Sequence, residues 1–387
     1  MIPAGIRLSR SFPAALLLLA GLVPATPQTP ETRRAETVAP GVEHIEIRRG
    51  DFAEGRETDR WTIHLLVLDP RSVRLDSALA MDEIAGAETT SSLAARRGAL
   101  AAVNGGYFRT TGIYRGEPAG MYAAGGKVLS EPNGPRMEMA VSNAGETVRI
   151  AFAEVALRAM VAAEDGERRT IDGINRPRGE GELVLFTPEF HRTTLTPGGG
   201  LEIAVRAGRV ARAEDGPGSS LIPADGFVLS AGGAARAWAL ARFRPGSPVG
   251  LEIETRSEPP LPFEPDWIVG AGPLLVRAGT ALGAEQSDAE GFAADFGRGR
   301  HPRTALGVRE DGRIVLAVVD GRQPRVSVGM TIPELSALMA GWGCREAINL
   351  DGGGSTTMVI DGKIVNRPSD AAGERPVSDA ILIVPRR

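Results

Sequence analysis

Three apolar runs of this sequence end in a polar residue that is followed by glycine. They lead into Asn104-Gly105-Gly106, Asp320-Gly321-Arg322 and Asp351-Gly352-Gly353-Gly354-Ser355. A strand end holds a side chain rigidly, and consecutive glycines let backbone N–H groups turn toward an anion. The sequence therefore predicts that carboxylates and N–H donors gather where these runs end.

Asp351 is the strongest candidate for a reactive carboxylate. Each Asp-Gly pair must also be weighed as a plain turn, because Asp-Gly is among the commonest turn signals. We interpret Asp311-Gly312 and Asp361-Gly362 as turns. At Asp320 both a turn and a site stay open, since polar residues follow it. At Asp351 three glycines and three hydroxyl residues exceed what a turn needs, which favours a site for acid, base or nucleophile chemistry.

Several standard active-site motifs do not fit. Position 357 is threonine, so Gly353-Gly354-Ser355-Thr356-Thr357 is not a G-x-S-x-G nucleophile elbow. The same stretch lacks the lysine of a phosphate-binding P-loop. The four histidines show no i, i+4 spacing and no C-x-x-C exists, so a zinc enzyme is not indicated.

Three further residues could take part in chemistry. Arg303 lies at the predicted entrance to a strand, where it could bind phosphate bidentately or form a surface ion pair. His301 could act as a general acid or be structural. Cys344 is the single cysteine; it is interpreted as a core residue, and no intramolecular disulfide can form.

The bulk composition is that of an ordinary globular protein of one large or two smaller domains. The chain has 387 residues, of which 42% are hydrophobic and 24% charged, and its net charge is −4. It therefore has no overall basic field for nucleic acid or anionic lipid. Arginine supplies nearly all of the basic charge, a bias typical of a GC-rich genome. The guanidinium fork also suits phosphate ligands at particular positions.

The N-terminus has the pattern of a secretory signal peptide. Two arginines precede an apolar run, and small residues follow near position 25. We expect a signal peptide at 1–25 and a flexible linker at 26–41, with the protein exported to the periplasm or the extracellular space. An uncleaved membrane anchor is the alternative, although the run is short for a membrane span. No stable membrane span is expected after cleavage.

The remaining chain is predicted to be α+β, with β-rich mixed sheets and a few helices. We expect a catalytic unit at 42–150 and 261–387, with a β-rich inserted subdomain at 151–260. The clearest elements are strands at 61–68, 99–103, 304–308, 314–319 and 347–350, hairpins turning at 125–126, 311–312 and 361–362, and helices after Thr89 or Thr90 and after the capping box Thr331–Glu334.

Taken together and in this order, several motifs resemble the phosphodiester glycosidase family. They are Asn104-Gly105-Gly106-Tyr107-Phe108, Gly272-Pro273-Leu274-Leu275-Val276, Arg303-Thr304-Ala305-Leu306-Gly307, Val319-Asp320-Gly321-Arg322-Gln323 and Asn349-Leu350-Asp351-Gly352-Gly353-Gly354-Ser355-Thr356. The resemblance runs from about residue 95 to the C-terminus and is strongest from 301 to 384.

The resemblance implies hydrolysis of the bond between a sugar's anomeric carbon and a phosphate that carries a second group. A GlcNAc-1-phosphodiester or an envelope glycan would be the substrate. Carboxylates stabilise the oxocarbenium-like state of such a reaction, in a retaining or an inverting geometry. We expect Asp351 and Asp320 to be the catalytic carboxylates. The expected substrate-binding residues are Asn104, Gly105, Arg303, Thr304, Arg322, Gln323, Gly352, Gly353, Gly354, Ser355, Thr356 and Arg367.

Two other classes of function stay open. One is a non-catalytic envelope glycan-binding protein that uses the same pocket. The other is a metal-dependent phosphodiesterase in which Asp320 and Asp351 hold Mg²⁺ or Ca²⁺. No cofactor is expected for the glycosidase, although a divalent cation stays open. The expected partner is a glycan or sugar-phosphate small molecule, with no nucleic acid; the sequence does not indicate the oligomeric state.

Overall fold

The protein is an elongated, β-rich molecule. A computed structural model describes residues 30–51 and 59–386. Strands take up 44% and helices 11% of the structure, which confirms the expectation of several sheets with few helices. Among the described residues every strand pair is antiparallel except β11 (Gly173–Ile174) with β12 (Leu183–Phe186), which is parallel.

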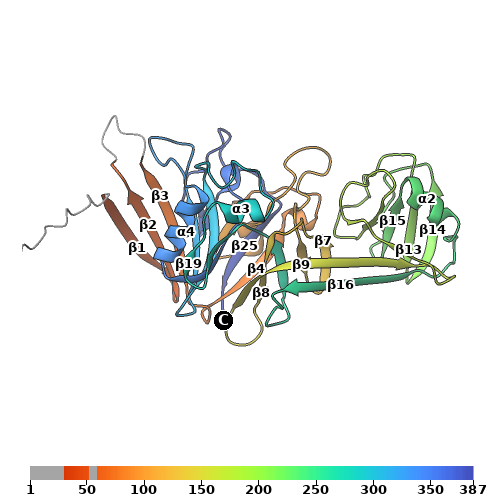
Figure 1. The fold of residues 1–387 in the computed structure, drawn as a ribbon, viewed down its shortest axis with the longest axis horizontal. Helices are drawn as coiled ribbons and strands as arrows, with labels where there is room; N and C mark the ends of the chain where they lie inside the picture. The colour runs from red at the N-terminus through yellow and green to blue at the C-terminus, as the bar shows by residue number, and fades with distance from the viewer. Residues whose placement is uncertain (1–29, 52–58, 387) are drawn as a thin grey trace, which may run out of the picture.

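An eight-stranded sheet forms one end of the molecule (Figure 1). Three of its inner strands either begin with predicted site residues or lead directly into them. Its strands in spatial order are β1 (Glu31–Ala39), β2 (Val42–Arg49), β3 (Trp61–Leu68), β21 (Ile314–Val319), β20 (Arg303–Arg309), β22 (Cys344–Asn349), β18 (Leu274–Arg277) and β19 (Thr280–Ala281). Helix α4 (Ile332–Gly341) packs on it through Leu335, Leu338 and Met339.

Two further sheets complete the body of the molecule. One contains β24 (Lys363–Ile364), β23 (Met358–Ile360), β5 (Ala101–Asn104), β25 (Asp379–Pro385) and β4 (Val73–Leu79), in that order. The other contains β10 (Arg168–Thr170), β9 (Arg149–Ala162), β8 (Met137–Ser142), β17 (Trp267–Gly270), β6 (Tyr122–Ala124) and β7 (Lys127–Ser130), with β16 (Gly250–Glu258) paired to β9.

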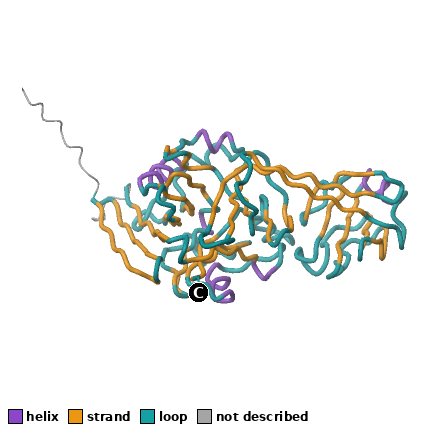
Figure 2. Tube along the Cα trace, turned by 90° about the horizontal axis from the view of Figure 1, so that it is seen from below, coloured by secondary structure: helices purple, strands orange, loops and turns teal. Residues whose placement is uncertain are grey.

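A distal lobe lies at the far end of the two long strands β9 and β16 (Figures 1 and 2). Its sheet contains β11 (Gly173–Ile174), β12 (Leu183–Phe186), β15 (Gly226–Ala231), β13 (Leu201–Arg206) and β14 (Arg209–Asp215). Helix α2 (Gly233–Leu240) packs on this sheet. The boundaries expected at 150 and 260 fall at the start of β9 and just after β16, and the division into domains stays a prediction.

The short helices have the signals that the sequence predicts. Helix α1 (Thr90–Arg97) begins after Thr89, whose side chain accepts a hydrogen bond from Ser92 N, and ends at Gly98 in the left-handed conformation. Helix α4 begins with the complete Thr331–Glu334 capping box. The other helices are α3 (Glu285–Ala289) and the 3₁₀ turns η1 (Ala80–Asp82) and η2 (Gly353–Ser355).

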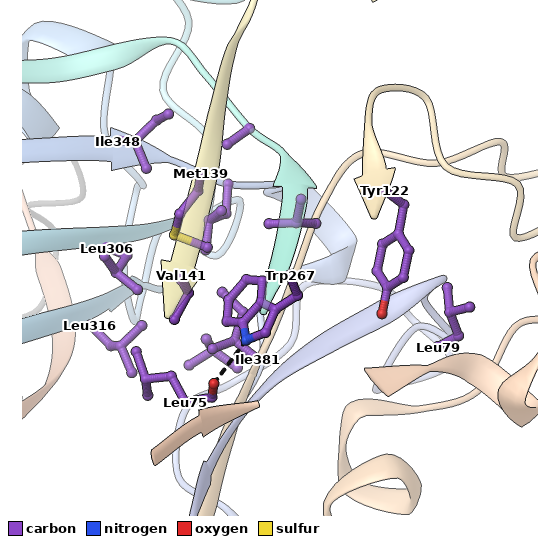
Figure 3. Close-up of a cluster of buried hydrophobic side chains, with 14 of the residues drawn as sticks. Leu75, Leu79, Tyr122, Met139, Val141, Trp267, Leu306, Leu316, Ile348 and Ile381 are labelled. Carbon is purple, nitrogen blue, oxygen red and sulfur yellow. Dashed lines mark hydrogen bonds between the residues drawn. The ribbon is translucent and has the colours of Figure 1, made fainter. Parts of the chain in front are cut away.

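The three sheets of the body share one large hydrophobic core. Figure 3 shows side chains from all three sheets meeting there, with Trp267 at the centre. Trp267 is 4% exposed, and its indole Nε1 donates to the carbonyl oxygen of Leu75 at 2.8 Å. The core members labelled in the figure are Leu75, Leu79, Tyr122, Met139, Val141, Trp267, Leu306, Leu316, Ile348 and Ile381.

The prediction of a flexible linker at 26–41 is wrong for residues 31–39. These residues form the edge strand β1, which pairs with β2 along its length. The polar composition that suggested a linker is that of an edge strand whose side chains are mostly exposed. Residues 26–29 and the predicted signal peptide at 1–25 lie outside the described residues. Within 30–51 and 59–386, no helix is both long and apolar enough to cross a bilayer.

Substitution of Trp267 by phenylalanine should lower the free energy of unfolding by about 1–2 kcal/mol, measured by urea denaturation. The variant loses the bond to Leu75 and leaves a small void, while Asn143 Nδ2 still satisfies the carbonyl oxygen at 2.8 Å. Trp342→Phe is the matched control, because Trp342 is only partly buried, beneath Arg33. Equal losses in the two variants would contradict a central role for Trp267.

Candidate active site

Strands β20, β21 and β22 of the eight-stranded sheet each have one end at the same edge of the sheet, the edge at which strands start or finish. Strand β20 begins at Arg303, which pairs with Val319 at the end of β21. Residue Ala305 of β20 pairs with Asn349 at the end of β22. Because β20 is antiparallel to both neighbours, its first residues lie beside the segments that follow β21 and β22. Asp320 and Asp351 therefore leave the sheet at the same edge.

Asn104, at the end of β5, joins a second sheet to this edge. Its side chain is completely buried, with Nδ2 donating to the Asp351 carbonyl oxygen at 2.7 Å. Its Oδ1 accepts from Thr304 Oγ1 at 2.7 Å and from Thr357 N at 3.2 Å. The Gly105 carbonyl oxygen accepts from Asp351 N at 3.1 Å. One amide thus holds together three of the predicted site segments.

Asp351 stands at the entrance to the glycine turn and keeps part of its surface open to solvent. Its Oδ1 accepts from Gly352 N at 2.9 Å. Burial raises the pKa of Asp351 to about 6, and the Gly352 N–H and the Arg375 charge oppose this rise. A carboxylate with such a pKa can exchange a proton near neutral pH.

Two arginines flank the glycine turn. A Cβ on Gly353 would stand 3.0 Å from Arg322 Nη2, and a Cβ on Gly354 would overlap Arg375 Nη2 and Asp370 Oδ1. Arg322 is exposed, and in the described ranges no carboxylate forms an ion pair with it. Arg375 is instead bound in bidentate fashion to Asp370, at 2.8 and 3.0 Å. Glycine is thus required where the guanidinium groups approach the backbone.

Buried polar atoms without hydrogen-bond partners gather around the same turn. They are Asn349 Oδ1, Ser355 Oγ, Thr356 Oγ1, Thr357 Oγ1 and Ser369 Oγ. Buried polar groups usually have partners, and an orphaned group is unfavourable by about 1–3 kcal/mol. A group of them beside a partly open carboxylate is typical of a site that receives a polar ligand.

Asp320 is almost fully buried and already well supplied with donors. Its carboxylate accepts from Asn366 Nδ2 at 3.0 Å and from Arg367 N at 2.9 and 3.1 Å. Burial raises its pKa to about 6, and the Asn366 and Arg367 donors oppose the rise. Asn366 Nδ2 also donates to the Thr356 carbonyl oxygen at 3.1 Å. Asp320 therefore fixes the loop that follows β24 against the glycine turn.

Arg303 is 1% exposed and forms no ion pair within the described residues. Its Nε and Nη2 donate to the carbonyl oxygens of Met330, Phe296 and Gly299 at 2.8 to 3.0 Å. Burial lowers its pKa to about 10. Because Nε and Nη2 are bound to backbone carbonyl oxygens, the phosphate contact that the sequence predicts would have to come from Nη1. His301 lies 3.3 Å from Arg322 Nη2 through Nδ1, and burial lowers its pKa.

The other predicted binding residues differ in accessibility. Thr304 is buried, and its hydroxyl is bound to Asn104. Gln323 donates to the carbonyl oxygens of Arg367 and Pro368 at 3.0 and 3.4 Å, which ties the same loop. The Arg367 side chain is exposed. Gln323 and Thr304 thus support the site from behind, whereas Arg322 and Arg367 can reach a ligand.

The sequence did not single out Asp379, Asp370 or Arg375. Asp379 is 1% exposed; its Oδ1 accepts from Gly106 N at 3.0 Å and its Oδ2 from Ser378 Oγ at 2.5 Å. A Cβ on Gly105 would overlap this carboxylate. Burial raises the pKa of Asp379, and its charge adds to the raised pKa of Asp351. These residues carry no local motif, because only the fold brings them to Gly105 and Gly354.

A family model matches just under half of the chain, in the part that holds most of this geometry. Residues 199–384 match the model of the phosphodiester glycosidases. These residues belong to the phosphodiester glycosidase family. The matched range includes Arg303, Asp320, the Asp351 turn and Asp379. The resemblance expected from about residue 95 is thus matched from residue 199 onward, which includes its strongest part at 301–384.

Curated relatives match only short stretches of this chain. The uncharacterized SPbeta prophage-derived protein YomE of Bacillus subtilis (strain 168) is 44% identical over 84 residues, 22% of this chain and 13% of that protein. N-acetylglucosamine-1-phosphodiester alpha-N-acetylglucosaminidase of Bos taurus is 32% identical over 104 residues, 27% of this chain and 19% of that enzyme. The chain thus spans less than a fifth of either relative.

Solved structures share the fold over nearly the whole chain. A Burkholderia pseudomallei protein thought to be exported has a TM-score of 0.82 at 24% identity, covering 93% of this chain and 98% of that one. A hypothetical protein from Synechocystis has a TM-score of 0.75 at 22% identity, covering 92% of this chain and 64% of that one. At these identities the likeness is one of fold.

Asp351→Asn should make the protein more stable at pH 8 by on the order of 2 kcal/mol, measured by urea denaturation. The folded pKa of about 6 lies above the unfolded value, so the folded state holds more protons between them. Stability is therefore lost as the pH rises through this window, and the neutral amide avoids that loss. The gain should vanish near pH 4, where the carboxyl is protonated. The exposed Asp361→Asn is the control, and a pH-independent difference for Asp351→Asn would contradict the assignment.

Proposed function

We propose that this protein hydrolyses the bond between a sugar's anomeric carbon and the phosphate of a glycosyl phosphodiester. The observation that carries the proposal is the position of Asp351. Asp351 is partly exposed, its carboxyl has a raised pKa, and it lies beside a glycine turn flanked by Arg322 and Arg375. Family membership of residues 199–384 supports the same reaction class.

The glycine turn and its arginines would hold the phosphate. Backbone N–H groups in a turn of glycines and an unpaired guanidinium are both suited to a phosphate anion. Arg322 can supply the charge, because no carboxylate among residues 30–51 and 59–386 neutralises it. The orphaned Ser355 and Thr356 hydroxyls would donate to the phosphate or the sugar once a ligand enters.

Asp351 would act in its ionised form on the sugar. Breaking the bond between the anomeric carbon and oxygen leaves positive charge on the ring, which a nearby carboxylate stabilises. The bonding electron pair leaves with the phosphate oxygen, which is already a stable anion and needs little protonation. Water supplies the new hydroxyl of the sugar, and its other proton ends on the phosphate or in solvent. The products are a free sugar and a phosphomonoester.

Asp320, the second carboxylate expected from the sequence, would act by positioning. Its oxygens hold Asn366 and the backbone of Arg367, which places the Arg367 loop over the turn. Asn104 and Gly105 would keep Asp351 in place through its backbone. An error of about 1 Å in placing a catalytic group can lower the rate roughly a hundredfold, so such bonds bear on turnover.

Asp351→Asn should lower kcat at least a hundredfold on UDP-N-acetylglucosamine or on an aryl phosphodiester of α-N-acetylglucosamine. The measurement is release of free sugar. Asp361→Asn is the matched control, since it makes the same change ten residues away in an exposed turn with positive φ. Wild-type turnover by Asp351→Asn would rule out this carboxylate.

The dependence of kcat/KM on pH should show an acid limb near pH 6. Below that pH Asp351 becomes protonated and loses the charge that stabilises the transition state, so the rate should fall about tenfold per unit. An activity that rises as the pH falls through 6 would instead identify Asp351 as a proton donor, and would contradict its proposed role.

The identity of the products separates this function from the alternatives. A metal-dependent phosphodiesterase breaks a P–O bond and releases sugar 1-phosphate, and a chelator would stop it. A glycosidase breaks the C–O bond and releases free sugar. Among the described residues no group of three His, Cys, Asp or Glu side chains is placed to hold a metal. A glycan-binding protein would release neither product while still binding the diester.

We also propose that the protein works outside the cytoplasm. The proposal rests on the basic, apolar and small-residue pattern of residues 1–25. Expression of the full chain in a Gram-negative host, followed by fractionation and N-terminal sequencing, tests it. A cytoplasmic product with an intact N-terminus would overturn this location.

A further inference from the structure

Strand β9 has a gap in its pairing where it crosses from the body to the distal lobe (Figure 1). Strand β16 pairs with it without interruption from Glu154 to Ala162. Strand β8 also pairs with Glu154, and β10 also pairs with Met160, so both must lie on the side opposite to β16. On that side no described strand pairs with the residues from Val155 to Arg158.

The backbone groups that face this gap follow from the alternation of a strand. The N–H and C=O of one residue point to the same side, and those of the next residue to the other side. The Ala159 carbonyl oxygen accepts from Ile171 N at 2.9 Å on the β10 side, so Val155 and Leu157 also direct their N–H and C=O groups to that side. Within the described ranges no donor or acceptor bonds to these groups of Val155 and Leu157.

A hollow of about 720 Å³ lies along this stretch of β9. The segment 131–134 of the body borders one end, and the segment 170–174 of the lobe borders the other. The two segments are in contact, since Ile174 N donates to Glu131 Oε2 at 2.8 Å. The hollow is open to solvent, because Glu154, Ala156 and Arg158 in its lining are exposed. The unpaired edge of β9 is therefore accessible to a ligand.

Acidic side chains outnumber arginines in the lining of the hollow. The acidic residues are Glu131, Glu154, Asp172 and Glu258, and the arginines are Arg158 and Arg256. Ion pairs with residues outside the lining do not change the balance, since Arg176 adds a positive charge beside Glu131 and Glu254 adds a negative charge beside Arg158. The hollow thus has an excess of negative charge.

Two of these carboxylates lie directly across from each other at the body end of the gap. Glu154 of β9 and Glu258 of β16 are cross-strand partners. Neither carboxylate has an ion pair or hydrogen bond to a residue that the structure describes, and the exposed Arg256 bonds to neither. Like charges directly opposite each other are unfavourable in a sheet. A cation placed beside both would remove this repulsion.

We propose that the gap binds an extended polypeptide segment of a partner protein that carries a basic side chain. The segment adds an antiparallel strand between β8 and β10, and its peptide groups pair with those of Val155 and Leu157. Its lysine or arginine lies beside Glu154 and Glu258. A sugar chain does not repeat donors and acceptors at the spacing of a strand, so the backbone edge favours a polypeptide. This binding does not depend on the proposed hydrolysis.

The probe is a blocked peptide of about six residues that alternates valine and arginine, titrated calorimetrically into the protein. Methyl groups on all its backbone nitrogens remove the N–H donors and keep the charge, and should weaken binding at least roughly tenfold. Glutamate in place of arginine should weaken it as much. No binding of the parent peptide, equal binding of the methylated one, or binding of a chitin oligosaccharide instead would overturn the proposal.

Variants of the protein test the acidic pair. Glu154→Gln combined with Glu258→Gln should weaken binding of the arginine peptide roughly tenfold. Glu164→Gln is the matched control, because it removes the same charge from the exposed turn that follows β9, and should change the affinity less than about twofold. Equal effects of the double variant and the control would contradict the role of the pair.

Amide hydrogen exchange locates the added strand. Binding of the peptide should slow exchange at Leu157, whose N–H faces the gap, at least roughly tenfold, and leave Ala156, whose N–H faces β16, unchanged. Binding without protection of Leu157 would overturn strand addition. Protection of Leu157 in the protein alone, rising with its concentration, would show that a second copy fills the gap and would also overturn the proposal.

Discussion

The buried amide of Asn104 is the contact on which the rest of the site depends. It is the point where a strand of one sheet meets the ends of two strands of another, and each of its polar atoms is used. Asn104 Nδ2 binds the Asp351 carbonyl oxygen, so the backbone of Asp351 is fixed, while its carboxylate accepts a hydrogen bond from Gly352 N of the glycine turn. An aspartate in its place could not donate, and a leucine would leave three buried groups without partners. The site is thus built by constraining backbone and leaving selected side chains unsatisfied.

Because the backbone is held in this way, several buried charged groups without ion pairs can lie together where these strands end. Asp351, Asp320 and Asp379 are carboxylates whose pKa is raised by burial. Arg303 is a buried cation that donates to backbone carbonyl oxygens and lies over the Phe296 ring, with no ion pair among the described residues. Each arrangement lowers the stability of the folded state, because charge is removed from water without a full ion pair. Asp320 and Asp379 compensate by holding loops, whereas Asp351 and the neighbouring hydroxyls do not. A polar ligand that binds Asp351 and these hydroxyls would offset the cost of burying them.

The sequence predicted the strands and caps well because their signals are local. Runs such as Ile314–Val319 and the Thr331–Glu334 capping box determine their own structure. The glycine turns were also located, since three strand ends followed by glycine form a pattern within one segment. The sequence predicted the roles of the site residues less well. Asn104 and Thr304 were expected to bind substrate, but in the structure the Thr304 hydroxyl donates to Asn104 Oδ1. Asp379 and Arg375 gave no signal, because they reach Gly105 and Gly354 only through pairing over long sequence separations. The edge strand β1 was mistaken for a linker because its exposed, polar composition resembles one.

The distal lobe also supports a loop of the body. It is joined to the body by the long strands β9 and β16, and it touches the body again beside β7. There Ile174 N donates to Glu131 Oε2 at 2.8 Å, and Arg176 Nε to Glu131 Oε1 at 2.5 Å. The lobe residues Phe190 and Thr194 hold Tyr114, next to Arg115. A surface loop without such support would sample many conformations. Because this support comes from the lobe, changes in the lobe can shift the loop that carries Tyr114, while the Asn104 side chain keeps the backbone of Asp351 in place.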